Sequence, residues 1–412
     1  MRLVVFLICL GSTGFISAYA ADPNHSLTLA QAISTAYEKN PGLSAAQWET
    51  GVAQGIHQQA SLIPNPELAW DVEDTRSGSQ INSITITQPF ELGGKRQARM
   101  NVAEVGKSLA SAEIVLKRNN LRADVIQAFY LALRAQEGLR LANESLQLAE
   151  RAVTVAKSRV VAGKTSPVEE TRAEVLLSSV RLEVRRAQLE QDNAYKQLAS
   201  YLGSTYPTFT SVIGNLEYLP RLPQKAELLA RIRNSPELYK ARLQIDQSDA
   251  ELNLQRTQRI PDLRVSIGSQ YDEQERERVN LVGVSLPLPL FDRNQGNVLA
   301  ASRQAGQAMD LRNATELRLI SETQQAFEQW QAAQADLNEI RNAILPAGQS
   351  AVESATRGFA MGKFGFLDVL DAQRTLISAR AQYLQSLADA IDAWVRIERI
   401  YGDTTSITDS QE

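Results

Sequence analysis

Apolar residues recur along much of this chain at alternating steps of three and four, the spacing that places them on one face of a coiled-coil helix. In the region 95–161, which contains no proline, they predict one uninterrupted helix. At about 1.5 Å per residue this helix would be about 100 Å long. Its seam consists of Val125, Ala128, Ala132, Ala135, Leu139, Ala142, Leu146, Ala149, Val153, Ala156 and Val160.

The many alanines in this seam allow helix axes to approach closely. A second stripe, formed by Leu141, Leu148 and Val155, runs beside it, so the helix should contact neighbours on two sides. A simple two-stranded coiled coil is the alternative. Three further helices repeat the pattern, and Pro346 predicts a kink in the second of them. Their seams are Leu177, Val180, Val184, Ala187, Gln191, Ala194, Leu198 and Tyr201; Ala326, Trp330, Ala333, Leu337, Ile340, Ile344, Ala347 and Ala351; and Val369, Ala372, Leu376, Ala379, Tyr383, Ser386, Ala390, Ala393, Ile397 and Ile400.

Short turns join the long helices in pairs. The segments 162–165 and 360–365 close the first and second pair. Ser166, followed by Pro167 and then by Glu169, predicts a capping box with proline at the first helical position.

Two pairs of segments alternate with period two, as β-strands with one apolar and one polar face do. The loop 76–80 separates the first pair, and the highly charged loop 272–278 separates the second. The apolar positions are Leu68, Trp70, Val72, Ile84 and Ile86 in the first pair, and Leu263, Val265, Ile267, Tyr271, Val282, Val284 and Leu286 in the second. Two soluble hairpins packed on helices are the alternative to a membrane sheet.

The chain repeats itself at an offset of about 198 residues. Ile63-Pro64 matches Ile260-Pro261, and Gly163-Lys164 matches Gly362-Lys363. We therefore expect a mainly α fold with a small β part, built from two helix–strand–strand–helix repeats. The expected boundaries are 21–203 for the first repeat, 204–223 for a connector, 224–402 for the second repeat and 403–412 for a polar tail.

The first twenty residues have the form of a signal peptide. Arg2 precedes the apolar run 3–10, and Ala18-Tyr19-Ala20 fits the cleavage rule. Cys9, the one cysteine, falls inside this segment without a visible lipoprotein cleavage box. No later apolar run approaches the roughly 20 residues of a spanning helix. We expect an exported protein without a transmembrane helix.

Composition argues against most catalytic chemistry. Two histidines and one cysteine among 412 residues are too few for zinc, thiol or iron–sulfur sites, and no serine elbow or phosphate loop is present. The net charge of −4 implies no strong single-sign field, so nucleic acid is not an expected partner. We expect no enzyme, no cofactor and no resident metal.

Export and alternating strands together suggest a barrel assembled from several copies. Four strands cannot close a barrel, since about eight is the working minimum. A dimer would give eight strands with a filled interior, and a trimer would give twelve with room for an open lumen. The long helices would continue the same tube away from the membrane.

The plan of the two repeats resembles the TolC family of outer-membrane efflux proteins, over roughly residues 27–402. The segment 367–372, Leu-Asp-Val-Leu-Asp-Ala, is similar to the tip of TolC. The segments 88–96 and 64–68 resemble the outer-membrane component of cobalt–zinc–cadmium resistance pumps. The resemblance implies a homotrimer with a twelve-stranded barrel in the outer membrane and a helical tunnel in the periplasm. It also implies a periplasmic adaptor (membrane fusion protein) and an inner-membrane, proton-driven RND transporter as partners.

The resemblance also implies roles for residues at the tunnel tip. Asp368 and Asp371 would form stacked acidic rings in the trimer, with Glu169 as the first-half counterpart of Asp368; ordinary helix-start acids are the alternative. The adaptor would dock at the turns of Gly163, Lys164, Gly362 and Lys363, which are alternatively plain helix-terminating turns. Phe364 stands where TolC has a basic residue that helps to lock the closed tip.

The function that follows is a passive exit duct of a tripartite efflux system, for heavy-metal cations of the cobalt, zinc and cadmium type. A TolC-like duct for organic drugs or secreted proteins is one alternative. A periplasmic coiled-coil structural or adaptor protein is the other. The scarcity of histidine does not argue against a metal cargo, because a conduit should hold its cargo weakly.

Overall fold

The computed structural model of the chain describes residues 26–76, 78–164, 166–214, 222–361 and 363–402. The predicted signal peptide, the predicted polar tail and part of the predicted connector lie outside these residues. In chain order the first half contains β1 (Ser26–Thr28), α1 (Leu29–Lys39), α2 (Pro41–Ala60), β2 (Glu67–Glu73), β3 (Ile81–Phe90), α3 (Lys95–Val161), α4 (Pro167–Tyr201) and β4 (Ser211–Ile213). The second half contains α5 (Lys225–Arg231), the 3₁₀ turn η1 (Ile232–Asn234), α6 (Pro236–Thr257), β5 (Leu263–Asp272), β6 (Glu277–Ser285), α7 (Gln295–Glu339), the π-helical segment η2 (Ile340–Ile344), α8 (Leu345–Ala360) and α9 (Phe366–Tyr401).

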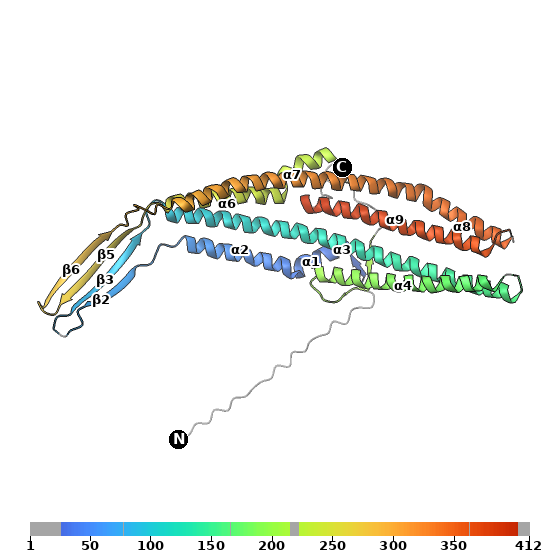
Figure 1. The fold of residues 1–412 in the computed structure, drawn as a ribbon, viewed down its shortest axis with the longest axis horizontal. Helices are drawn as coiled ribbons and strands as arrows, with labels where there is room; N and C mark the ends of the chain where they lie inside the picture. The colour runs from blue at the N-terminus through green and yellow to red at the C-terminus, as the bar shows by residue number, and fades with distance from the viewer. Residues whose placement is uncertain (1–25, 77, 165, 215–221, 362, 403–412) are drawn as a thin grey trace, which may run out of the picture.

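The molecule is elongated, with a β-sheet at one end and two helical hairpin turns at the other (Figure 1). The 67 residues of α3 span about 100 Å, so the predicted length and bounds of this helix are confirmed. The turn between α3 and α4 and the turn between α8 and α9 lie at the same end (Figure 1). The two halves of the sequence are therefore laid side by side along one axis.

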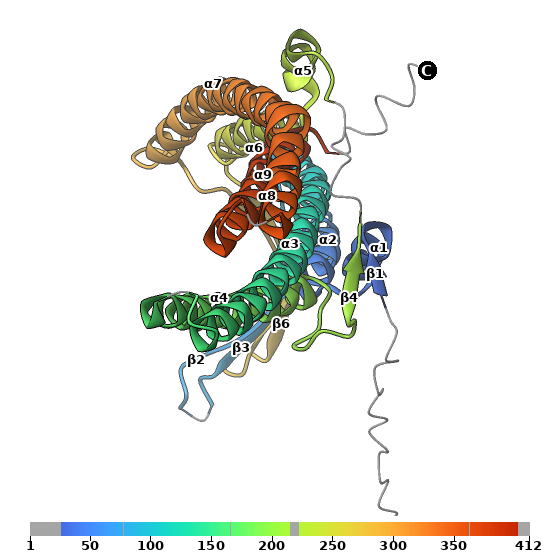
Figure 2. The same cartoon turned by 90° about the vertical axis from the view of Figure 1, so that its right-hand side faces the viewer.

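The long helices form a curved layer, which is clearest when viewed along the molecule (Figure 2). Helix α3 packs against α4 on one side and α9 on the other, and α9 packs against α8. The order across the tip half of the layer is thus α4, α3, α9, α8, with α4 and α8 at the edges. The predicted two-sided contacts of α3 are confirmed.

The alanine-rich seams form the core of this layer. On α3, Val125, Ala128, Ala132 and Ala135 are all less than 5% exposed. On α9, all predicted seam residues are buried except Ala372 and Tyr383, which are half-buried. Small side chains keep the helix axes close together, and larger ones, including Phe129 and Trp394, fill the wider space near the middle of the molecule.

One predicted seam is wrong in its last part. Trp330, Leu337 and Ile340 are buried as expected, but Ile344, Ala347 and Ala351 are exposed. The cause is η2, because a π-helical turn inserts one extra residue into the helical repeat. The buried positions resume one residue later, and they include Gly348 and Ala355. Pro346, whose nitrogen carries no hydrogen, follows directly in the first turn of α8, where the sequence predicted a kink.

Asparagine or serine followed by proline begins three of the helices. Ser166 caps α4 with Pro167 in the first turn, and α2 and α6 begin in the same way with Asn40 and Ser235. The predicted capping box at α4 is wrong, however. The Ser166 hydroxyl accepts from the Val168 N–H (3.4 Å), and the Glu169 carboxylate lies 3.7 Å from Arg172 instead of reaching back to Ser166.

The four predicted strands form one antiparallel sheet in the order β2-β3-β5-β6. Its register pairs Leu68 with Ile86, Ile86 with Ile267, and Ile267 with Val282. Because facing residues of neighbouring strands share a face, the apolar positions of all four strands lie on the same side of the sheet. A separate parallel pair, β1 with β4, joins the start of the described chain to the connector.

Among the described residues, no helix is both long enough and apolar enough to cross a membrane.

Candidate functional site

The apolar face of the sheet is the largest uncovered apolar surface that the strands present. Trp70, Ile84, Ile267 and Val282 are between 55% and 78% exposed. Leu68, Ile86 and Val284 extend the same face and are similarly exposed. A surface of this kind requires a cover of apolar material. Since no helix of this chain packs on either face of the sheet (Figure 1), the alternative of a helix-covered soluble hairpin pair is wrong for the described chain.

The opposite face of the sheet is polar. On this face Arg264 and Glu67 approach each other to 3.5 Å. Ser266 lies two residues after Arg264 along β5 and therefore on the same face. Two glycines on this face allow close approach. A Cβ atom at Gly268 would meet the Ile84 carbonyl oxygen at 2.6 Å, and one at Gly283 would meet the Ser266 hydroxyl at 2.5 Å. The predicted alternation of the strands is therefore confirmed.

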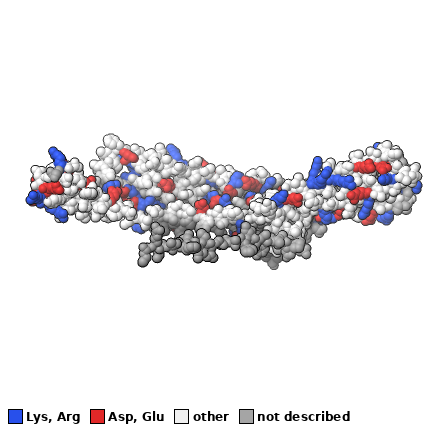
Figure 3. Space-filling model, turned by 90° about the horizontal axis from the view of Figure 1, so that it is seen from below, with Lys and Arg blue, Asp and Glu red and all other residues white. Residues whose placement is uncertain are grey.

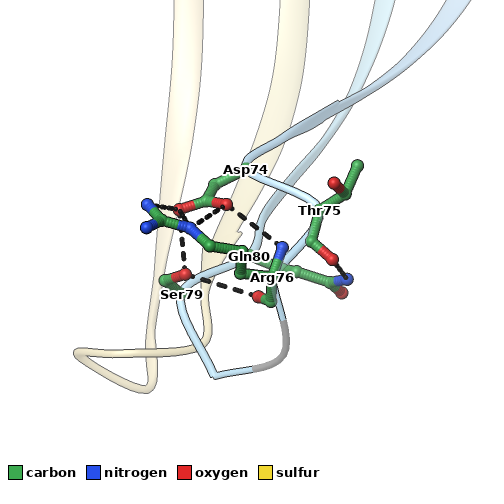
Figure 4. Close-up of polar contacts among 5 residues, drawn as sticks. All are labelled: Asp74, Thr75, Arg76, Ser79 and Gln80. Atoms are coloured by element: carbon green, nitrogen blue, oxygen red, sulfur yellow. Dashed lines mark hydrogen bonds and ion pairs between the residues drawn. The ribbon is translucent and has the colours of Figure 1, made fainter.

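The loops at the far end of the sheet are charged and internally bonded. Asp74 has a left-handed backbone conformation, and its carboxylate accepts hydrogen bonds from the Arg76 backbone N–H (3.1 Å) and the Ser79 hydroxyl (2.9 Å), with Arg76 also paired to it at 2.6 Å (Figure 4). The Arg76 guanidinium, the Arg76 N–H and the Ser79 hydroxyl together lower the pKa of Asp74 to about 2. Charged side chains gather at this end in Figure 3, next to a largely uncharged stretch of the sheet.

The junction between sheet and helices is built for a sharp change of direction. Gly93 and Gly94 both have positive φ angles, 72° and 75°, which disfavour any other residue. Lys95 then pairs with Asp262 at 2.5 Å, and Arg99 pairs with Glu91. The first ion pair joins the start of α3 to the residue before β5, and the second joins α3 to the residue after β3, so the junction has a clear structural role.

At the other end, the predicted acidic residues of the tip start the last helix. The Asp368 carboxylate accepts a hydrogen bond from the Gly365 N–H at 2.7 Å, which is the structural role of a helix-start acid. Asp371 lies one turn further along α9, and both residues are exposed. Glu169, at the start of α4, is half-buried.

The predicted docking turns end their helices in the usual way. Gly163 has a φ of 65°, and the Lys164 N–H donates to the Arg159 carbonyl at 2.8 Å, a pattern typical of a helix-terminating glycine turn. In the second turn the Lys363 N–H donates to the Gly358 carbonyl at 2.9 Å. Gly362 lies outside the described residues. Both turns sit at the same extreme end of the molecule (Figure 1).

The ring of Phe364 lies against the backbone of Gly358. It is half exposed.

A groove of about 310 Å³ lies between the two hairpins close to the tip, and sequence reasoning missed it. Its lining includes Glu169 of α4, Asp368 of α9 and Arg159 of α3. Apolar side chains line the rest, including Val155, Leu367 and Leu370. The one sequence signal for this groove is that Glu169 and Asp368 occupy equivalent positions in the two repeats. Asp371 does not line the groove.

No cluster of three or more histidine, cysteine, aspartate or glutamate side chains suited to hold a metal ion occurs among the residues that the structure describes. His57 of α2 lies 3.3 Å from Glu104 of α3. This contact joins two helices near the sheet, far along the molecule from the tip.

The chain matches the family model described as outer membrane efflux protein over residues 32–204 and 230–403. It is 39% identical to the cobalt-zinc-cadmium resistance protein CzcC of Cupriavidus metallidurans, over 95% of this chain and 93% of that protein. It is 28% identical to the nickel-cobalt-cadmium resistance protein NccC of Alcaligenes xylosoxydans xylosoxydans, over 73% and 68% of the two chains. The crystal structure of the Campylobacter jejuni CmeC outer membrane channel is similar in fold, with a TM-score of 0.76 at 15% identity, and the match covers 100% of this chain and 97% of that one. The predicted resemblance to this family is thereby confirmed: this chain belongs to the outer membrane efflux protein family.

Proposed function

We propose that three copies of this chain form a duct across the outer membrane and through the periplasm, and that the duct is the exit of a tripartite efflux system. The observation that carries the proposal is the sheet: four strands, two open edges and one exposed apolar face. Three such sheets give twelve strands, enough for a barrel with an open lumen.

The dimensions of the sheet agree with a membrane barrel. The ten residues of β5 extend about 33 Å. At the strand tilt of about 40° that is usual in membrane barrels, this corresponds to a height of about 25 Å, which is that of their apolar band. In this arrangement Val265, Ile267, Val282 and Val284 face the lipid, while Arg264 and Ser266 face the lumen. The helical layer then continues the tube into the periplasm.

Heavy-metal cations of the cobalt, zinc and cadmium type are the proposed cargo. The support is the 39% identity, over nearly the full length of both chains, to a protein named for resistance to these three metals. A duct needs no tight metal site, because a conduit that binds its cargo strongly would conduct slowly.

The tip is the proposed contact with a periplasmic adaptor, which would connect the duct to an inner-membrane RND transporter driven by protons. The turns of Gly163, Lys164, Gly362 and Lys363 would be the docking positions. The groove between the hairpins supports this proposal, since it combines apolar walls with the charges of Arg159, Glu169 and Asp368. A helical hairpin of an adaptor could fill such a groove.

Asp368 and Asp371 are proposed to form two acidic rings around the axis at the tip, with Glu169 nearby as the first-half counterpart. Their exposure in the single chain is compatible with a position on the lumen. Rings of carboxylates at a constriction attract cations.

The test of the function is growth of a deletion strain on graded zinc, cobalt and cadmium, and in parallel on antibiotics, with the plasmid-borne gene as the complementing control. Hypersensitivity to the three metals, restored by the plasmid, is the expected result. Hypersensitivity to antibiotics alone would favour the second candidate, a duct for organic drugs. A protein that leaves the membrane fraction without detergent would instead be a periplasmic structural or adaptor protein.

A further inference from the structure

The apolar face of the sheet becomes polar toward the end that lies away from the helices. Residues that face one another across neighbouring strands form rows on this face. From the helices outward, three successive rows are Leu68, Ile86, Ile267 and Val282; then Trp70, Ile84, Ser269 and Asn280; then Val72, Asn82, Tyr271 and Arg278. The first row is entirely apolar, whereas the third contains one aliphatic residue, Val72. The face that meets lipid in the proposed duct is therefore apolar over only part of its height.

The apolar surface continues at the other end, beyond the last residue of β6. The segment 286–294 leads from β6 to α7. Its four apolar side chains are between 45% and 90% exposed: Leu286, Leu288, Leu290 and Phe291. Pro287 and Pro289 have no backbone N–H to donate, so this segment cannot extend the hydrogen bonding of the sheet. As a result the strand ends at Ser285, and the apolar side chains beyond it stay exposed.

The other three crossings between helices and sheet have the same character. Leu62 and Ile63, which precede β2, are exposed. Leu92, which follows β3, and Ile260, which precedes β5, are exposed as well. The exposed apolar residues of all four crossings are named the collar here. The collar lies between the helices and the apolar rows of the sheet (Figure 1), so in a trimer it would surround the duct on the periplasmic side of the barrel.

Three exposed arginines lie on the helix side of the collar. Arg96 belongs to the first turn of α3, Arg259 follows α6, and Arg293 precedes α7. The Arg96 Nε donates to the Ser61 carbonyl at 2.7 Å, and the Arg293 guanidinium donates to the Leu290 carbonyl at 3.4 Å. In the part of the chain that the structure describes, none of the three arginines forms an ion pair with a carboxylate.

Two acids of the crossings are already paired with other cations. Asp262 pairs with Lys95, and Glu91 pairs with Arg99. Each copy therefore presents three guanidinium groups directly beneath an apolar surface. This combination matches a phospholipid, whose acyl chains and phosphate group carry the complementary chemistry.

We propose that the collar is embedded in the periplasmic leaflet of the outer membrane, and that Arg96, Arg259 and Arg293 bind the phosphate groups of its phospholipids. The inference rests on the proposed duct and adds the depth at which the duct sits in the bilayer. Insertion of the collar removes Phe291 and its neighbouring leucines from water. A guanidinium group can donate two parallel hydrogen bonds to one phosphate.

The height of the apolar band supports this position. Successive rows lie two residues apart and differ in height by about 5 Å at a strand tilt of about 40°. The rows of Trp70 and Val284 are two such steps apart, about 10 Å, whereas the apolar band of a membrane barrel is about 25 Å tall. Six residues of extended chain from Val284 to Leu290 can add about 15 Å at the same tilt. The collar thus supplies the missing height, and the row of Arg278 falls at the headgroups of the opposite leaflet.

Spin labels on single cysteines test the depth of the collar, because Cys9 is the only cysteine of the chain and falls in the predicted signal peptide. The protein carrying Phe291→Cys is labelled and reconstituted in vesicles of phosphatidylethanolamine and phosphatidylglycerol. Dissolved oxygen enters hydrocarbon and a polar nickel chelate does not, so the ratio of their collision rates with the label measures its depth. This ratio should be close to that at Ile267→Cys, and at least about fivefold above that at the exposed tip residue in Phe364→Cys.

Two results at Phe291→Cys would overturn the inference. A label that both reagents reach as they reach Phe364→Cys lies in water, and a label that neither reagent reaches is covered by a second copy. In both cases a lipid-exposed label at Ile267→Cys leaves the duct intact. A label at Ile267→Cys that also lies in water overturns the proposed duct and this inference with it. Leu288→Cys takes the place of Phe291→Cys if the latter reduces the yield of trimer.

Removal of arginines tests the phosphate contacts. Arg259→Gln with Arg293→Gln should lower the amount of phospholipid that stays bound to the detergent-solubilised trimer at least about threefold, as measured by mass spectrometry. The matched control is Arg181→Gln with Arg185→Gln, which removes two exposed arginines of α4. The same phospholipid content in the two double variants would overturn the phosphate contacts.

Discussion

The first repeat carries its long helix without a break, whereas the second divides the equivalent helix into α7, η2 and α8. In α3 the seam residues Ala132 and Ala149 are both buried. In the second repeat Leu337 is buried and Ala351 is exposed. The two repeats share one sequence pattern, and the one extra residue of η2 is enough to give their helices different neighbours.

This difference corresponds to position in the layer. Helix α3 is central and contacts α2, α4, α6 and α9, so it has neighbouring helices on both sides. Helix α8 is at an edge and contacts α9 on one side only. An edge helix can present a second apolar stripe outward without loss of its internal contacts, and a central helix has no free side for one.

The largest expected effect comes from moving the break of the second repeat into the first. At the offset that aligns Gly163 with Gly362, Gln147 takes the place of Pro346. Gln147→Pro removes a backbone hydrogen bond in the interior of α3 and should lower the free energy of unfolding by about 3 kcal/mol or more. Pro346→Gln should change it by less than about 1 kcal/mol, because the first helical turn of α8 tolerates either residue. Equal losses in chemical unfolding of the two variants would contradict the assigned difference between the repeats.

The two faces of the sheet give the next comparison. Arginine at Ile267, if this residue lies near the middle of the bilayer, should cost about 2–4 kcal/mol in the folding of the barrel in lipid. Ser266→Arg should cost clearly less, because Ser266 lies on the polar face. Folding in lipid vesicles against urea measures both variants. If both arginines are tolerated alike, the apolar face does not meet lipid.

Much of this architecture could be predicted from the sequence, where the signal was long and periodic. The bounds of α3 and the alternation of the strands follow directly from repeated apolar positions. The rephasing at η2 could not be predicted, since the apolar spacing continues through Ile344 and Ala351 as if the helix were regular. The paired strands β1 and β4 have only three residues each, too few to show a period.

The tip shows the same limit for individual side chains. The sequence pattern Ser-x-x-Glu predicts a capping box at Glu169, but Arg172 one turn later competes for the carboxylate. The groove between the hairpins depends on how two distant segments approach each other, and no local pattern encodes that distance. The motif at 367–372 identified the family, while the geometry around it required the structure.

The two tip hairpins differ in their acids, and this gives a smaller expected effect. The second carries exposed Asp368 and Asp371, and the first carries Glu169 paired with Arg172. Asp368→Ala with Asp371→Ala should reduce cation selectivity in single-channel recordings and weaken block by multivalent cations from the periplasmic side. Glu169→Ala should have a weaker effect. Trimer yield should stay near wild type, since each helix-start acid contributes only about 0.3–1 kcal/mol.

Unchanged selectivity and unchanged cation block in the double variant would reduce these aspartates to helix-start residues. A loss of trimer yield would assign them to assembly instead of to the proposed acidic rings.

The smallest expected effect concerns the loop between β2 and β3, at the end of the sheet opposite the tip. The pKa of Asp74 is lowered to about 2 by Arg76 and Ser79, so the folded loop favours the charged carboxylate. The resulting stabilisation is fully present above the ordinary pKa of about 4, and it is lost as the pH falls through about 2. The Asp74 carboxyl carbon, followed by NMR in detergent micelles, should titrate near pH 2. Asp74→Asn should loosen the loop at pH values above about 2, where the wild-type carboxylate is charged, without changing the barrel. A titration near pH 4 would show that the hydrogen bonds of Figure 4 are not formed in solution, and the ordered loop would then have to depend on the left-handed turn at Asp74 alone.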